Sequence, residues 1–147
     1  MEELPMIEVS DGSRDCINVA FDASLAEVES LLRRNGWTNV RVRNAAYLNG
    51  ELPILELERP ILDELVRFHI RLFRYRDAIV GNAHLDALTL EATPEAVRLH
   101  RPFHDMGRDL IVGLFIRGGY DVEFSANRCG GDNVIAKIYK SGSGIRT

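Results

Sequence analysis

Apolar and polar positions divide the chain into short amphipathic runs. Residues 6–9 and 16–21 are apolar-rich and are separated by a Ser-Asp-Gly-Ser sequence at 10–13, whose residues favour turns. We expect a β-hairpin there. A second hairpin is predicted from 40–43 and 54–58, which alternate like half-buried strands on either side of Asn49-Gly50, the dipeptide of a tight hairpin turn.

Helical spacing is clearest just after the first hairpin. Ser24 followed by Glu27 has the spacing of a capping box, and apolar residues then recur every three or four positions. Gly36 suits the left-handed conformation that ends a helix. The pattern predicts a helix over 24–35.

A long central helix is predicted over 60–80. Pro60 suits the first position of a helix, where its missing N–H has no bond to lose. When the segment is wound at about 100° per residue, its apolar side chains cover more than half of the circumference. A helix of this kind is covered on more than one side, so we expect it to organise the core.

The C-terminal third is predicted to hold a helix and a strand pair. The helix runs over 102–117 and is stopped by Gly118-Gly119, after a short helix opened by a Thr-Pro-Glu sequence at 93–95. Strands are expected at 120–124 and 134–139. The predicted fold class is therefore α+β, with short antiparallel β-hairpins packed on a long central helix and a second C-terminal helix. Residues 1–140 are expected to form a single globular domain, and 141–147 a flexible tail.

Composition and charge exclude some classes of partner but do not identify a function. The chain has 147 residues, a formal net charge of −4 and a pI near 5.6, so no overall field attracts it to phosphate backbones or anionic lipid. Its first residues are acidic where a secretory signal is basic, which predicts a cytoplasmic protein. Cys16 and Cys129 are expected to be free thiols, with a bridge between them left open.

The most suggestive composition is the arginine and aromatic run at 67–76. On a helix, Arg67, Arg71 and Arg74 share one polar strip, which could bind an acidic partner or simply be solvated. His69 and Arg76 instead fall among the apolar side chains of the helix. These five residues are the predicted binding residues. The expected partner is another protein or an anionic ligand. Nucleic acid is not favoured, no membrane contact is expected, and a homo-oligomer is left open.

A metal-ligating group is the second candidate site. His100 and His104 have the i, i+4 spacing that lets two imidazoles reach one ion, and Asp105 could add an oxygen. Pro102 lies between the two histidines, and a helix that begins there would turn them onto different faces.

The last quarter of the chain resembles restriction-endonuclease-like nucleases. The resemblance rests on a helix ending in Gly118-Gly119, the strand at 120–124, and a Gly-Gly-Asp-Asn-Val-Ile-Ala-Lys sequence at 130–137. It implies that Asp132 is a magnesium ligand. The family also has an acidic residue, one spacer and a lysine on the following strand, and this chain has Ile-Tyr-Lys at 138–140 instead.

The expected function is a small soluble non-enzymatic binding or regulatory module, acting through protein–protein contact on the arginine-bearing helix face. The alternative is a metal-dependent nuclease or hydrolase that uses Asp132 or the group around His104. A structural subunit whose broad apolar helix faces a partner chain is a third reading. No cofactor is expected, because the chain has no phosphate loop, dinucleotide fingerprint or nucleophile elbow.

Overall fold

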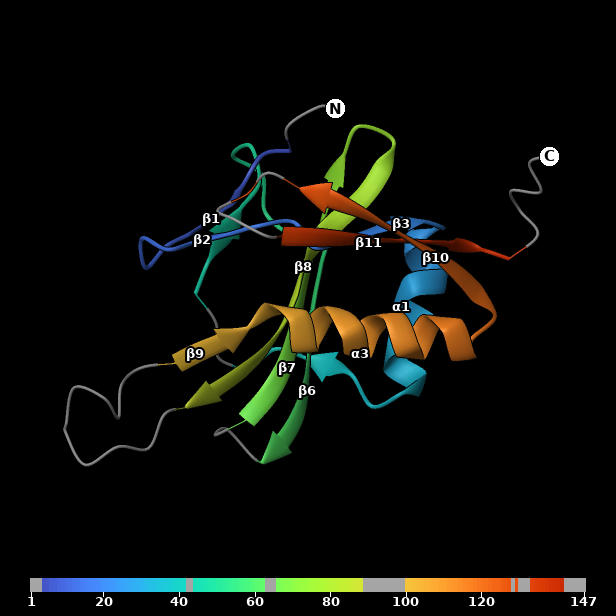
Figure 1. The fold of residues 1–147 in the computed structure, drawn as a ribbon. Helices are drawn as coiled ribbons and strands as arrows, with labels where there is room; N and C mark the ends of the chain where they lie inside the picture. Colours follow the sequence, from blue (N-terminus) through green and yellow to red (C-terminus); the bar gives the residue numbers. More distant parts are fainter. Residues whose placement is uncertain are drawn as a thin grey trace.

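The structure is a computed structural model that describes residues 4–41, 44–62, 66–88, 100–127, 129 and 133–141. Strands make up most of it (Figure 1). They are β1 Ile7–Val9, β2 Arg14–Asp15, β3 Val19–Asp22, β4 Thr38–Asn39, β5 Ala46–Tyr47, β6 Leu55–Leu62, β7 Val66–Tyr75, β8 Ala78–Leu88, β9 His100–Phe103, β10 Tyr120–Asn127 and β11 Asn133–Lys140. The helices are α1 Leu25–Arg34 and α3 His104–Arg117.

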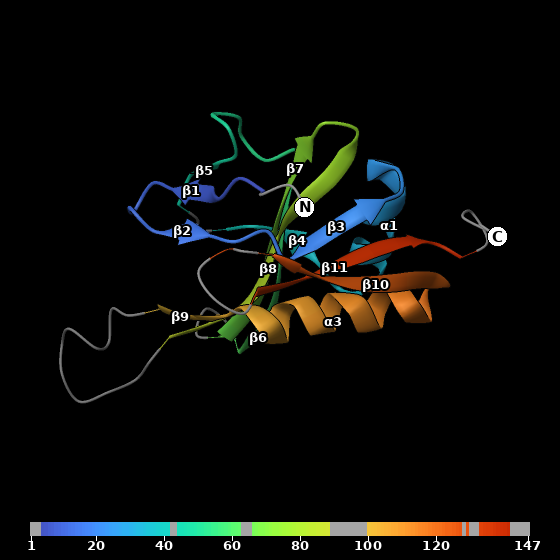
Figure 2. The same ribbon diagram turned by 45° about the horizontal axis from the view of Figure 1, so that its top comes forward.

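The strands form one large mixed sheet and one small sheet. The large sheet has the order β10-β11-β3-β8-β7-β6-β4, and β9 pairs with the far end of β8. Its pairs are antiparallel except for β11 with β3. The small sheet has the order β2-β1-β5 and lies to one side of the large sheet (Figure 2). Strong twist turns β10 and β11 away from the direction of β6, β7 and β8 (Figure 1).

The predicted fold class is wrong, because the described residues of the predicted central helix form the end of β6, all of β7, a turn and the start of β8. From 66 to 72 the side chains alternate with a period of two, with Phe68, Ile70 and Leu72 on one face. Phe73 is buried on the opposite face, so the strand is covered on both sides and its apolar residues also fit a helical arc. The turn after β7 has no glycine, and Arg76 adopts its positive φ of 56°.

Several local predictions are confirmed. Helix α1 begins after Ser24, which makes the capping box with Glu27, and Gly36 follows its end with a φ of 91°. Helix α3 ends at the predicted glycines, and β10 pairs with β11. The turn at Asn49 also forms, but the predicted second hairpin does not: β5 pairs with β1, while β4 pairs with β6. The short helix predicted near 94 and most of the predicted tail lie outside the described residues.

Two apolar cores lie on opposite faces of the large sheet. Helices α1 and α3 bury Leu32 and Phe115 against Phe21, Ile70 and Leu72 on one face. On the other face the small sheet covers a second cluster, whose members are Ile7, Val9, Ile17, Ala46, Leu48, Phe73, Val80 and Ile135. The second core covers the β7–β8 hairpin near its turn. Farther from the turn, the side chains on the same face of the hairpin are polar.

The start of α3 is anchored where β3 leaves the edge of β8. There the side chain of Asn18 replaces a strand: its Oδ1 accepts from the Ala83 N–H at 2.9 Å, and its Nδ2 donates to the Ala83 carbonyl at 2.8 Å. Gly107 of α3 lies directly on His84, since a Cβ at position 107 would come within 2.2 Å of the His84 Cα. The first turn of α3 is thereby held beside the polar part of β8.

A disulfide joins Cys16 to Cys129, with Cα atoms 5.8 Å apart. The expectation of free thiols is therefore wrong, because the approach of two segments 113 residues apart could not be read from their spacing. In the described part of the chain, neither helix has the length and apolarity needed to cross a bilayer.

Candidate functional site

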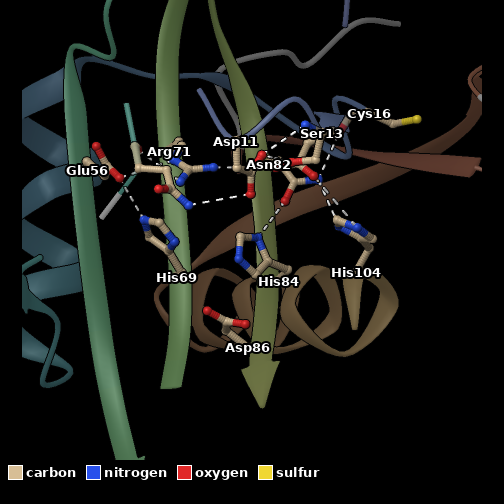
Figure 3. Close-up of polar contacts among 12 residues, drawn as sticks. Asp11, Ser13, Cys16, Glu56, His69, Arg71, Asn82, His84, Asp86 and His104 are labelled. Carbon is tan, nitrogen blue, oxygen red and sulfur yellow. Dashed lines mark hydrogen bonds and ion pairs between the residues drawn. The ribbon is translucent and has the colours of Figure 1, made fainter. Parts of the chain in front are cut away.

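Polar side chains from three neighbouring strands form a lattice on the sheet face that also carries the second core. The cross-strand pairs are Arg71 with Asn82, His69 with His84, and Arg67 with Asp86. On β6, Glu56 and Glu58 occupy the next positions of the same rows. Figure 3 shows part of this lattice with His104 at the start of α3; the lattice residues labelled there are Glu56, His69, Arg71, Asn82, His84 and Asp86. Burying so many polar groups costs free energy unless they pair with one another, and most of them do.

The arginines of the lattice are matched by carboxylates. Arg67 donates to Glu58 at 2.6 Å and lies 3.6 Å from Asp86. Arg71 donates to Glu56 at 3.1 Å and lies 3.4 Å from Asp15. Burial alone would raise the pKa of Glu58, but the arginines more than offset burial and lower it. These guanidinium groups therefore serve first as internal partners of the sheet.

Asn82 fixes the protonated nitrogen of two histidines. Its Nδ2 donates to the carbonyl oxygen of Cys16 at 2.7 Å, so the amide can take only one orientation. The second hydrogen of Nδ2 then points to His104 Nδ1 at 3.1 Å, and Oδ1 faces His84 Nδ1 at 2.9 Å. Neutral His104 must accept at Nδ1 and carry its proton on Nε2. Neutral His84 must carry its proton on Nδ1 and leave Nε2 bare.

Glu56 fixes the third imidazole in the same way. His69 Nε2 lies 2.8 Å from a Glu56 carboxylate oxygen, which can only accept, so Nε2 carries the proton and Nδ1 is bare in the neutral ring. Burial would raise the pKa of Glu56, but the hydrogen bonds and charges of His69 and Arg71 lower it overall. The carboxylate is therefore kept ionised as the acceptor for both groups.

The bare nitrogens of His69 and His84 have no hydrogen-bond partner in the described part of the chain. The two rings are adjacent, with centres 5.1 Å apart, and Figure 3 shows the remaining nitrogen of each on the side of the other ring. Their side chains are 1% and 6% exposed. Among the described residues, the fully buried side-chain polar atom without a partner is Trp37 Nε1, and neither imidazole nitrogen belongs to that class.

Both of these histidines are held neutral. Burial lowers the pKa of His69, and the hydrogen bond that His69 donates to Glu56 opposes burial without reversing it. Burial lowers the pKa of His84 further, helped by the nearby His69, His104, Arg71 and Arg67. At neutral pH the pair therefore presents two lone pairs.

His104 lies at the outer side of the cluster, with its side chain about one third exposed (35%). Its Nε2 is 4.0 Å from Asp15 Oδ1. Burial raises the pKa of Asp15, although the charges of His104 and Arg71 act against burial. The pair is a candidate acid–base unit, because a carboxyl group with a raised pKa lies beside a partly exposed N–H donor.

The predicted arginine-bearing helix face does not exist, because its residues lie on a strand. Arg67, His69 and Arg71 do share one face of β7 and belong to the cluster. Arg74 is exposed on the opposite face, and Arg76 lies at the hairpin turn over the ring of Tyr75. Three of the five predicted binding residues are therefore brought together, on a sheet instead of a helix.

The predicted metal residues are not gathered into one group. His104 faces Asn82 and Asp15, while Asp105 is exposed and pairs with Arg108 at 3.2 Å. His100 lies in β9, but its side chain and the whole of Asp132 are outside what the structure describes. Within the described residues, no set of three or more His, Cys, Asp or Glu side chains surrounds a position for a metal ion.

Six members of the site were not predicted from the sequence: Asp15, Glu56, Glu58, Asn82, His84 and Asp86. A signal for most of them was present. Polar residues alternate with apolar ones in Glu-x-Glu at 56–58, Arg-x-His-x-Arg at 67–71 and Asn-x-His-x-Asp at 82–86, which is the period of a strand with one polar face.

Comparison with protein-family models, curated proteins and solved structures finds no match for this chain. Its function must therefore be inferred from the geometry of the site.

Proposed function

We propose that this protein is a binding module for a small ligand, and that His69 and His84 are the ligand-contacting residues. The observation that carries the proposal is the pair of bare imidazole nitrogens. Each belongs to a ring held in one tautomer by a second partner, and neither nitrogen has a partner of its own. The two nitrogens lie side by side and have no partner among the described residues, so a ligand that pairs with both lone pairs is favoured.

The chemistry of the site favours a ligand with hydrogen-bond donors or positive charge. Two lone pairs accept and cannot donate. Three guanidinium groups, those of Arg41, Arg67 and Arg71, face four carboxylates, which leaves one net negative charge when the imidazoles are neutral. The expected anionic ligand has less support, because these arginines already face acidic partners.

A matched set of small molecules tests this proposal. Ammonium, amidinium and alcohol fragments are titrated into protein labelled with ¹⁵N-histidine, alongside the same fragments with every donor hydrogen replaced by methyl. We expect at least one donor fragment to shift the bare-nitrogen resonances of both His69 and His84, and its methylated form to have no effect. The proposal is wrong if neither a fragment nor a metal cation moves either resonance. Methylated and unmethylated fragments that act alike would exclude a hydrogen-bond donor as the ligand.

A hydrolase is the second candidate function, favoured by the raised pKa of Asp15 beside the exposed imidazole of His104. In this reading Asp15 exchanges a proton with water or a leaving group while His104 Nε2–H donates to the substrate. The test is turnover of p-nitrophenyl esters and phosphoesters by the wild type, Asp15→Asn and His104→Gln. Activity lost in both variants supports hydrolysis, and equal rates in all three proteins exclude this pair as a catalyst.

A further inference from the structure

We infer that the imidazole pair binds one divalent transition-metal ion through His69 Nδ1 and His84 Nε2. This inference rests on the proposed function and names its ligand. Imidazole nitrogen suits zinc, copper, nickel and cobalt, whereas magnesium and calcium prefer oxygen ligands. It departs from the sequence-based expectation that no cofactor is bound.

The spacing of the two rings fits a shared ion. Two imidazoles bound at a metal–nitrogen distance of about 2.0 Å and a tetrahedral angle have ring centres about 5.2 Å apart. The ring centres of His69 and His84 are 5.1 Å apart. The antiparallel register sets this separation, because the two residues are direct cross-strand partners on β7 and β8.

The partners of the two rings are those of metal-bound histidines. A ligating imidazole usually donates its other N–H to a carboxylate or carbonyl oxygen, which fixes the ring and makes the ligating nitrogen more basic. Here the Glu56 carboxylate accepts from His69 Nε2–H, and the Asn82 amide oxygen accepts from His84 Nδ1–H. Both bare nitrogens are therefore oriented before any ion arrives.

The charge around the pair tolerates a cation. Arg67 and Arg71 are close enough to lower the pKa of His84, but each also faces two carboxylates. Neither ring has to release a proton when the metal binds, because both imidazoles are neutral and the metal binds the nitrogen that carries no proton. Metal binding thus adds positive charge to a set with an excess of acidic groups.

The protein supplies two ligands, because no third His, Cys, Asp or Glu among the described residues completes a group around one position. Water or another small ligand fills the remaining coordination positions. Such a site resembles an open metal centre more than a closed structural one, and it should release its ion to a chelator.

The test uses the untagged full-length chain after treatment with EDTA, and dialysis against Zn²⁺, Ni²⁺, Cu²⁺ or Co²⁺, with Mg²⁺ and Ca²⁺ for comparison. We expect one equivalent of transition metal, no retained Mg²⁺ or Ca²⁺, and an association constant at least tenfold lower in His69→Phe and His84→Phe. The chain has four histidines, and His100→Gln is the matched control, which should bind within about threefold of wild type.

A measurement on the wild type covers the case in which the phenylalanine variants unfold. The electron paramagnetic resonance spectrum of the Cu²⁺-loaded protein should show two coordinated imidazole nitrogens. Failure to bind any of the four metals, binding unchanged in the His69 and His84 variants, or a copper spectrum without two nitrogens overturns the metal inference. If donor fragments still shift both histidines, the proposed binding function survives without the metal. If they do not, both are wrong.

Discussion

Asn82 Nδ2 donates a hydrogen bond of 2.7 Å to the carbonyl oxygen of Cys16, and this bond connects the disulfide-anchored segment to the imidazole cluster. The same segment supplies Asp15, which faces Arg71 and His104, and Asn18, which holds the edge of β8. The covalent link at Cys16 therefore fixes backbone and side chains on which the orientation of two histidines depends.

Removal of the disulfide should destabilise the fold and loosen the site. In Cys16→Ser/Cys129→Ser we expect the free energy of unfolding to fall by about 2–5 kcal/mol, because the bridge closes a long loop in the unfolded chain. Urea titration of the double variant and of oxidised wild type measures the change. Equal stability of the two proteins would show that the link does not constrain the fold.

Gly107 should tolerate no side chain. Gly107→Ala places a methyl group 2.2 Å from the His84 Cα, and we expect a loss of at least about 2 kcal/mol because backbone must move. Gly113→Ala is the matched control in the same helix. A Cβ at position 113 would meet no other atom within 4 Å, so the free energy of unfolding of this variant should rise by about 0.5–1 kcal/mol through helix propensity. Similar denaturation midpoints for the two variants would contradict the close packing of α3 on β8.

The buried histidines should make the protein less stable as pH falls. The pKa values of His69 and His84 lie below the ordinary 6.5, so the unfolded chain binds more protons from that pH downward. Each histidine contributes a slope of at most about 1.4 kcal/mol per pH unit. The stability that each neutral histidine contributes is fully present above pH 6.5, the ordinary pKa of histidine in the unfolded chain, and it is lost as the pH falls below that value.

The raised pKa of Asp15 acts in the opposite direction, since the folded state then binds its proton more readily at pH values above the ordinary 3.8. A comparison with His84→Gln isolates one histidine from this effect. Denaturant titrations from pH 8 to pH 5.5 should give a smaller pH slope in the variant than in the wild type. Identical slopes would mean that His84 titrates normally in the folded protein.

Elements that depend on local chemistry could be predicted from the sequence. Elements that depend on burial within the sheet could not. The capping box at Ser24 and the glycines after α3 act within a few residues, so their elements were found. The pattern of the β7–β8 hairpin fits a helix because Ile70 and Phe73 are buried on opposite faces. In addition, Arg76 occupies a turn position where glycine or asparagine is usual.

The site could be predicted only in part for a related reason. Alternation identifies Arg67, His69 and Arg71 as neighbours on one face once β7 is recognised as a strand. It does not reveal that His84 lies opposite His69, because the register follows from the two-residue turn. The approach of Asp15 depends on contacts between segments distant in the sequence, which no local pattern contains.

The protonation pattern of the imidazole rings tests the binding proposal directly. A long-range ¹H–¹⁵N correlation spectrum of ¹⁵N-histidine protein at pH 8, assigned with single His→Gln variants, reports which nitrogen of each ring carries the proton. We predict a protonated Nε2 on His69 and His104 and a protonated Nδ1 on His84, with His69 Nδ1 and His84 Nε2 bare. A His84 ring protonated on Nε2, or a His69 ring protonated on Nδ1, would contradict the paired lone pairs on which the binding proposal rests.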